Sequence, residues 1–169
     1  MPSMYGTLDE ANTYFATRLH TTAWDHASST QKTNALYQGA EIIDSLNFKG
    51  CKATVYTALE TDIYATQVTL RAAEAAQELE FPRDADTEIP LAIEKACYEI
   101  AYSLLDGVDP TLELENLAVT NQAYAGVKTS YNRDQQPIEH IINGVPSFIA
   151  WKLLRPFLRD PRSIKFSRI

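Results

Sequence analysis

The chain has few of the residues that build nucleotide-binding and catalytic loops. Only six glycines occur in 169 residues, and no GxGxxG, GxxxxGKS/T or GxSxG pattern is present. Dinucleotide-binding, P-loop and nucleophile-elbow sites therefore have no support. The twenty-two acidic residues offer many carboxylate pairs, but no pair is distinguished by its position. We expect a protein with no enzymatic activity and no cofactor.

Metal-ligand spacings are also missing. His20, His26 and His140 form no ligand pattern with either cysteine, although His20 and His26 alone remain an alternative ligand pair. The acidic residues between positions 84 and 88 alternate like the start of a calcium loop, but the loop glycine and the distal glutamate are absent. We interpret the histidines as surface or packing residues and the acidic stretch as a solvated turn, and we expect no metal site.

Cysteine and long apolar runs are scarce as well. Cys51 and Cys97 lie far apart without a CxxC pair, and the N-terminus lacks the charged start and apolar run of a signal peptide. We therefore predict two reduced thiols, with a disulfide as the alternative. No stretch approaches the roughly 20 apolar residues that a membrane span needs, so we expect no membrane partner.

Charge is distributed unevenly along the chain. The last eighteen residues hold six basic residues and one acid, a net charge of +5, whereas the preceding residues hold nine basic residues and twenty-one acids, a net charge of −12. An acidic body disfavours electrostatic binding to nucleic acid, whose phosphates require a positive surface. The polarity indicates an acidic body joined to a basic C-terminal segment with a separate role.

This basic segment also carries apolar side chains. Pro156 and Pro161 disfavour a helix through it, so we predict an extended arm over residues 159–169 that docks on a partner protein. A frayed terminus is the alternative. The residues expected to make the docking contact are Arg159, Arg162, Ile164, Lys165, Phe166, Arg168 and Ile169.

Helical spacing dominates the body. Thr7 and Glu10 have the spacing of a capping box, and Pro90 suits the first turn of the most regular apolar pattern in the chain, which we expect at the centre of the core. Residues 51–59 are β-prone, which predicts a short strand or an irregular segment. The fold class is therefore mainly α, a small helical bundle of four to five helices within residues 1–158. The helices are expected at about 8–19, 28–46, 62–79, 90–105 and 145–158.

One β excursion is expected between the last two helices. Two short β-prone runs surround Gly126, which predicts a β-hairpin at about 117–131. We expect its Tyr124, Val127 and Tyr131 to contact a neighbouring subunit. Stacking of Tyr124 and Tyr131 on bases is the alternative, but only Lys128 and Arg133 supply nearby positive charge.

Four segments together resemble a family of tailed-phage head–tail connector, or adaptor, proteins. Tyr5–Phe15 is similar to the first helix of the family, and Trp24 with the apolar face of 36–46 is similar to the second. Residues 77–83 resemble the family's Gln-x-Leu-x-aromatic-Pro-Arg signature. Residues 89–105 are similar to the helix that follows this signature in the family. The likeness covers about residues 5–106, although the interval between Gly50 and Phe81 is longer than the family pattern. Some members are instead labelled DnaT-like single-stranded-DNA-binding proteins.

The resemblance implies a structural virion protein in the neck, assembled in the host cytoplasm. Connectors form a ring under the portal, which implies twelve copies of the chain, contact with the portal and with a downstream tail or nozzle protein, and a channel for double-stranded DNA without sequence-specific binding. Closed head-to-tail contacts generate such rings. Single-stranded-DNA binding is the alternative function, and the acidic body argues against it because that function needs a basic groove with interleaved aromatics.

Overall fold

The computed structural model describes residues 3–117, 121–124, 127–130 and 139–160, and most of these residues are helical. The mainly α fold is thereby confirmed, but four to five helices is too few, because nine α-helices occur within the described residues. They are α1 (Leu8–Ala16), α2 (Thr22–His26), α3 (Ser29–Asp44), α4 (Ala53–Thr61), α5 (Gln67–Ala76), α6 (Leu91–Leu105), α7 (Pro110–Leu117), α8 (Glu139–Ile142) and α9 (Phe148–Leu154).

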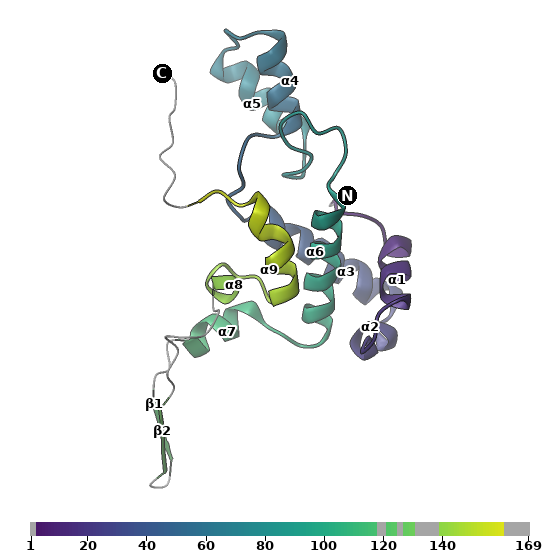
Figure 1. The fold of residues 1–169 in the computed structure, drawn as a ribbon, viewed down its shortest axis with the longest axis vertical. Coiled ribbons are helices and arrows are strands. Elements are labelled where there is room, and N and C mark those ends of the chain that lie inside the picture. Colours follow the sequence, from purple (N-terminus) through teal and green to yellow (C-terminus); the bar gives the residue numbers. More distant parts are fainter. Residues whose placement is uncertain (1–2, 118–120, 125–126, 131–138, 161–169) are drawn as a thin grey trace.

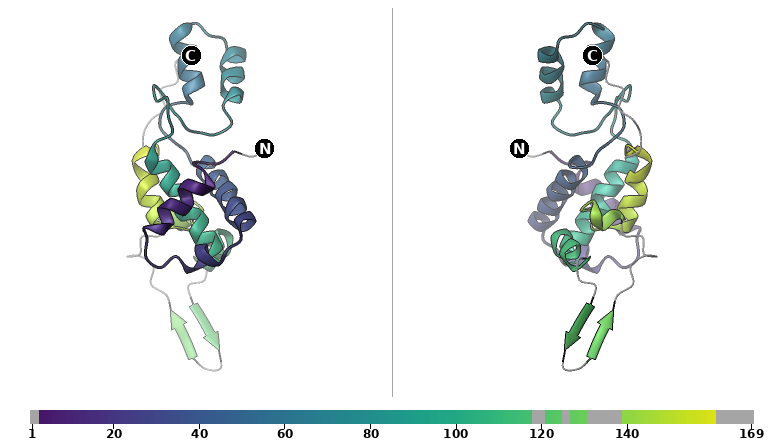
Figure 2. Two further views of the ribbon diagram at one scale, coloured as in Figure 1. Left: turned by 90° about the vertical axis from the view of Figure 1, so that its right-hand side faces the viewer. Right: turned by 90° about the vertical axis from the view of Figure 1, so that its left-hand side faces the viewer.

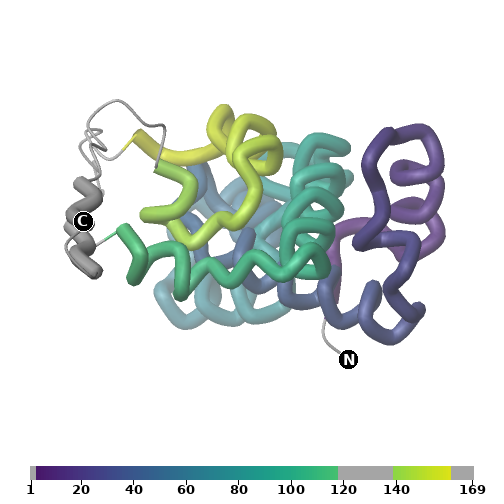
Figure 3. The backbone as a smooth tube through the Cα atoms, turned by 90° about the horizontal axis from the view of Figure 1, so that it is seen from below, coloured from purple at the N-terminus to yellow at the C-terminus, as the bar shows by residue number. Residues whose placement is uncertain are grey.

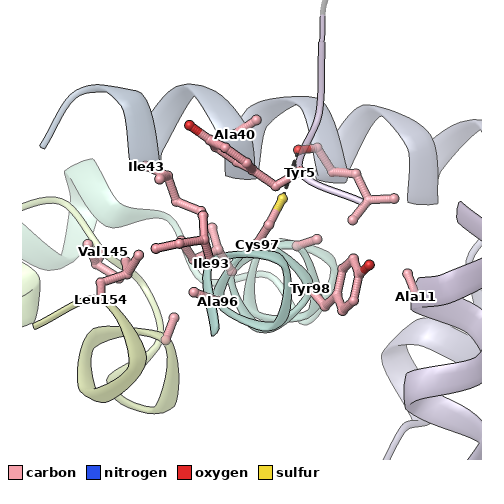
Figure 4. Close-up of a cluster of buried hydrophobic side chains, with 14 of the residues drawn as sticks. Tyr5, Ala11, Ala40, Ile43, Ile93, Ala96, Cys97, Tyr98, Val145 and Leu154 are labelled. Carbon is pink, nitrogen blue, oxygen red and sulfur yellow. Dashed lines mark hydrogen bonds between the residues drawn. The ribbon is translucent and has the colours of Figure 1, made fainter. Parts of the chain in front are cut away.

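Helix α6 is the centre of the core, as its apolar spacing predicts. It contacts α1, α2, α3 and α9, and Figure 3 shows it between α1–α2 on one side and α8–α9 on the other. The close-up in Figure 4 shows side chains of α6 between those of α3 and α9. The buried residues of α6 are Ile93, Ala96, Cys97, Tyr98, Glu99, Ile100 and Ala101.

Helices α3 and α6 cross at Gly39. A Cβ atom at this position would lie 3.1 Å from the Cys97 carbonyl oxygen and 3.3 Å from its sulfur. The close approach brings Cys97 Sγ within 3.4 Å of the Leu36 carbonyl oxygen, to which it donates (Figure 4). A small residue at position 39 therefore lets the two helices share one apolar layer.

The substitution Gly39→Leu is expected to lower the free energy of unfolding by about 1–3 kcal/mol, because overpacking forces shifts in a close-packed core. Glu41→Leu is the matched control, since Glu41 is exposed on the same helix and a surface change usually stays within about 0.5 kcal/mol. Urea unfolding of both variants measures the difference. Equal stability of the two variants would contradict the role of Gly39.

The N-terminal segment differs from the expected helix 8–19. The capping box of Thr7 and Glu10 is present, but α1 ends at Ala16. The hydroxyl of Thr17 donates to the Tyr14 carbonyl at 3.0 Å, and His20 turns the chain at a φ of +62°. The short helix α2 was not predicted, because its only buried side chain is Trp24 and one apolar residue produces no periodicity.

The predicted helix 62–79 is present but shorter, as α5, whereas the predicted strand or irregular segment 51–59 is wrong, because α4 covers most of it. Two helices, α4 and α5, occupy this region and pack against each other. The backbone of Asp62 is extended and ends α4, and the Thr66 side chain caps α5 by accepting from the Thr69 amide. Within α4 the Thr57 hydroxyl donates to the Ala53 carbonyl at 2.9 Å, so this polar group has a partner inside the helix.

The region after α6 holds a helix that the sequence analysis missed. Asp109 Oδ1 accepts from the Thr111 amide at 2.9 Å and so caps α7, which begins at Pro110. Beyond it, β1 (Asn121–Tyr124) pairs antiparallel with β2 (Val127–Ser130). The predicted hairpin falls on this stretch, of which only the two strand segments belong to the described residues. A subunit contact by Tyr124, Val127 and Tyr131 stays a prediction, and Tyr131 lies outside the described residues.

The last predicted helix, 145–158, is shorter in the structure. The Ser147 side chain caps α9 by accepting from the Ala150 amide, and α9 ends at Leu154. A 3₁₀ helix, η1 (Arg155–Phe157), follows, with Pro156 inside it. Proline cannot donate the hydrogen bond that would continue the α-helix, so the chain changes direction here.

Candidate interaction surfaces

Helices α4 and α5 form a hairpin that stands apart from the bundle. Neither helix has a buried residue, and Figures 1 and 2 show the pair extending from one end of the body. Ile63, Tyr64 and Val68 are 75%, 85% and 78% exposed, and Leu59 is also exposed. We call Leu59, Ile63, Tyr64 and Val68 the hairpin tip. Clustered exposed apolar side chains of this kind indicate a protein–protein contact.

The turn that carries the hairpin tip is held by Asp62. Its Oδ1 accepts from the Tyr64 amide at 2.9 Å, and its carbonyl accepts from the Ala65 amide at 3.0 Å. An aspartate that bonds the backbone two residues later stabilises a tight turn. Ile63 and Tyr64 are therefore presented on an ordered turn, although their side chains have little contact with the body.

The base of the hairpin is held by Arg83, which is only 9% exposed. Its Nε donates to the Lys49 carbonyl at 2.8 Å and its Nη2 to the Gly50 carbonyl at 2.9 Å, while Nη1 binds the Glu80 carboxylate. Lys52 Nζ donates to the Gln77 carbonyl at 2.9 Å from the other side. The segment that leads into the hairpin, residues 49–52, is thereby bonded to the segment that leads out of it, residues 77–83.

Gly50 is required at this base for two reasons. Its φ is +73°, and a Cβ atom would lie 2.0 Å from Asp84 Oδ2. Asp84 Oδ1 accepts from the Cys51 amide at 2.9 Å, so the loop 84–88 begins with a structural contact. The signature-like segment 77–83 therefore has an identifiable structural role in this chain, which is to close the base of the α4–α5 hairpin.

A cavity of about 330 Å³ lies at the same base. Lys52, Arg71 and Arg83 line it, together with Glu74 and Glu80. A cavity lined by three basic side chains has the composition of an anion-binding site. However, Arg83 and Lys52 are already bound to Glu80 and to backbone carbonyls. The cavity is therefore a weak candidate for ligand binding.

A second exposed apolar region lies on α7, α8 and the start of α9, at the opposite end of the body from the hairpin tip (Figure 1). We call it the α7–α9 surface, and its apolar side chains are between 40% and 57% exposed. The Phe148 ring lies 5.6 Å from the His140 ring, and Lys152 Nζ lies 4.7 Å from the Phe148 ring centroid. The apolar residues of this surface are Leu112, Leu114, Ile142, Phe148 and Ile149.

The C-terminal segment is attached to the body further than the sequence indicates. The Phe157 carbonyl accepts from the Lys49 amide at 2.9 Å, and the Arg159 amide donates to the Asn47 carbonyl at 2.9 Å. The Phe157 ring packs edge-on against Phe81 at 5.7 Å. Arg159, expected as the first residue of a free arm, is thus fastened to the body beside the base of the hairpin.

The remaining docking residues lie outside the described residues. They are Arg162, Ile164, Lys165, Phe166, Arg168 and Ile169. Their role as a docking arm stays a prediction. The chain reaches them from Asp160, next to the Asn47–Lys49 segment.

The histidines, acidic residues and cysteines that the sequence analysis considered as metal ligands or thiols can be placed in the structure. No group of three or more His, Cys, Asp or Glu residues within the described ranges lies close enough to hold a metal ion. The His20 carbonyl accepts from the Tyr102 hydroxyl at 2.7 Å. Cys51 and Cys97 are free, and burial raises the pKa of the Cys97 thiol to about 12, so this thiol stays protonated.

Among the described residues, no helix is both long and apolar enough to cross a membrane.

Comparison of the chain with protein-family models, curated proteins and solved structures gave no match. The resemblance to phage connectors therefore depends on the short motifs of residues 5–106, and membership of that family stays a prediction.

Proposed function

We propose that this protein is a structural subunit of a tailed-phage virion, a head–tail connector that forms a ring under the portal. In this proposal it has no enzymatic role, it contacts the portal and a downstream tail protein, and double-stranded DNA passes through its ring. The observation that carries the proposal is the α4–α5 hairpin, in which no residue is buried although apolar side chains cover its tip. A chain gains little folding free energy from an element without a buried residue, because hydrophobic stabilisation follows buried area. A contact with other subunits explains its presence.

Two further features support an assembly role. The α7–α9 surface provides a second apolar region at the other end of the body. The C-terminal segment leaves the body beside the base of the hairpin, where Arg159 is bonded to Asn47. A subunit with two apolar surfaces and a terminal segment of different composition can contact copies of itself and a different ring at the same time.

The proposal is tested by locating the protein in virions. Electron microscopy of purified virions should show this chain in the neck, and mass measurement should give twelve copies, to match the symmetry of the portal. A single copy at the neck, or absence from the virion, would overturn the proposed function. Rings of the isolated protein are not required, because acidic subunits repel one another until the portal supplies a template.

Single-stranded-DNA binding is the alternative function, and a binding experiment distinguishes it from the connector role. At about 150 mM salt, residues 1–160 should bind single-stranded DNA no better than a generic acidic protein, because few positive contacts are available to release counterions. Arg18, Lys52 and Arg83 each pair with a glutamate, and Phe15 and Trp24 are buried. Fluorescence anisotropy with a labelled oligonucleotide measures this. Tight binding by the truncated chain would favour the alternative.

A further inference from the structure

The structure presents two exposed apolar surfaces that have no partner within the described part of the same chain. The hairpin tip lies at one end of the molecule, whereas α7, α8 and the start of α9 lie on the body, on the side toward β1 and β2 (Figure 1). We propose that the hairpin tip of one copy binds the α9 part of the α7–α9 surface of the next copy. This inference rests on the proposed ring and assigns the surfaces that join its subunits.

The distribution of charge favours the α9 part of this surface, which consists of Phe148 and Ile149, as the partner of the hairpin tip. The hairpin tip is flanked by Glu60 and Asp62, which are both exposed. On α9, Lys152 is exposed and lies over the Phe148 ring. Helix α7 carries Glu113 and Glu115 beside its leucines, which would repel the tip. Opposite charges around an apolar contact set its partner and its orientation.

The same charges disfavour contacts between identical surfaces. Two hairpin tips placed together would bring the carboxylates of Glu60 and Asp62 into proximity with their own copies, and like charges in a contact are unfavourable. A tip-to-tip contact would also end at two subunits and leave the α9 surface exposed. The tip-to-α9 contact is heterologous, so it continues from copy to copy and closes when the rotation between copies permits a ring.

The contact between one pair of copies should be weak. The hairpin tip consists of four side chains, whereas a stable interface buries about 800 Å² on each partner. Closure of a ring gives each subunit two such contacts, and the second contact forms at a high effective concentration. Association should therefore be detectable for free subunits only at high protein concentration, or after crosslinking.

The first test is a mixing experiment with the full chain. Ile63→Asp blocks the tip and Ile149→Asp blocks the α9 surface. Each variant alone should sediment as a monomer, because its dissociation constant for self-association should rise at least about tenfold. An equimolar mixture should form a one-to-one dimer, because each variant retains the surface that the other has lost. Leu19→Asp, at a residue that is 81% exposed and outside both surfaces, is the control and should associate like the unmodified chain.

The second test identifies the contact directly. Benzoylphenylalanine at position 64 replaces one exposed aromatic side chain with another and can be crosslinked by light. Mixed isotopically labelled and unlabelled chains should give intermolecular crosslinks to residues 148–152. Crosslinks between two positions 64, dimers of Ile149→Asp alone, or no association of the unmodified chain in either test would overturn the inference. A twelve-copy ring in virions with crosslinks elsewhere would overturn the inference and leave the proposed function standing.

Discussion

Deletion of residues 161–169 is expected to abolish attachment of the protein to portal-bearing heads while its melting temperature stays nearly unchanged. The structure decides where the deletion should start. Phe157 packs against Phe81, and the backbone of Arg159 is bonded to Asn47, so these residues belong to the body. Truncation after Asp160 retains these contacts and removes the predicted docking residues.

The effect on attachment should be large because the removed segment combines apolar anchors with basic residues. In the proposed role, Phe166 and Ile169 contribute most of the affinity, since buried anchors usually dominate an interface. Arg162, Lys165 and Arg168 mainly accelerate the encounter with an acidic partner. Replacement of these three by glutamine should therefore slow attachment and reduce its salt dependence, whereas Phe166→Ala with Ile169→Ala should prevent it.

A matched control separates docking from folding. Deletion of residues 155–169 also removes Phe157 and Leu158, which pack against the core, and should lower the melting temperature. Cosedimentation with heads and thermal unfolding monitored by circular dichroism measure the two effects. If the chain truncated after Asp160 still joined heads normally, or if it unfolded, the predicted arm would be idle or part of the core.

The second large effect is expected at a charged pair in the core. Glu99 is 2% exposed on α6, accepts from the Tyr14 hydroxyl at 2.6 Å, and pairs with Arg18. The hydrogen bond to Glu99 raises the pKa of Arg18, and burial together with the same carboxylate raises the pKa of Tyr14 to about 12. Arg18→Ala would leave a buried carboxylate without its cation, which should destabilise the fold by about 3–5 kcal/mol.

A double substitution tests the origin of this cost. If the unpaired carboxylate is responsible, Glu99→Leu introduced into the Arg18→Ala protein should recover part of the lost stability, because an apolar side chain is compatible with the core. Chemical denaturation of the two single variants and of the double variant measures the coupling. Additive losses in the double variant would show that Arg18 stabilises through its contacts with Phe15 and Tyr102 rather than through the charge of Glu99.

Local signals in the sequence were sufficient for the central helices. The apolar spacing of 90–105 predicted α6 and its place in the core, and the spacing of 28–46 predicted α3. The capping box at Thr7 marked the start of α1 correctly. These predictions succeeded because helical spacing and capping involve residues only three or four positions apart, so the interactions that stabilise them are visible in the order of residues.

The α4–α5 hairpin and its exposed tip could not be predicted from local sequence patterns. The segment 53–76 combines β-branched residues with helix formers and has no apolar face that requires burial, so its division into α4 and α5 could not be located. Arg83 and Glu80 belong to a short motif in the sequence, but their role depends on Lys49 and Gly50, which are more than 30 positions away and lie beside Arg83 only in the folded chain. The exposed Ile63 and Tyr64 had no pattern that distinguished them from core residues.

The sequence by itself determined that the protein is mainly helical, that α6 is at the centre of the core, and that an acidic body ends in a basic segment. The tertiary structure decided that α4 and α5 leave the bundle, that Arg159 remains attached to it, and that Glu99 is buried against Arg18, which lies 81 positions away. The physical reason is the range of the interactions. Spacing and capping act within one helix, whereas exposure of an apolar tip and burial of a charge depend on which distant segments meet.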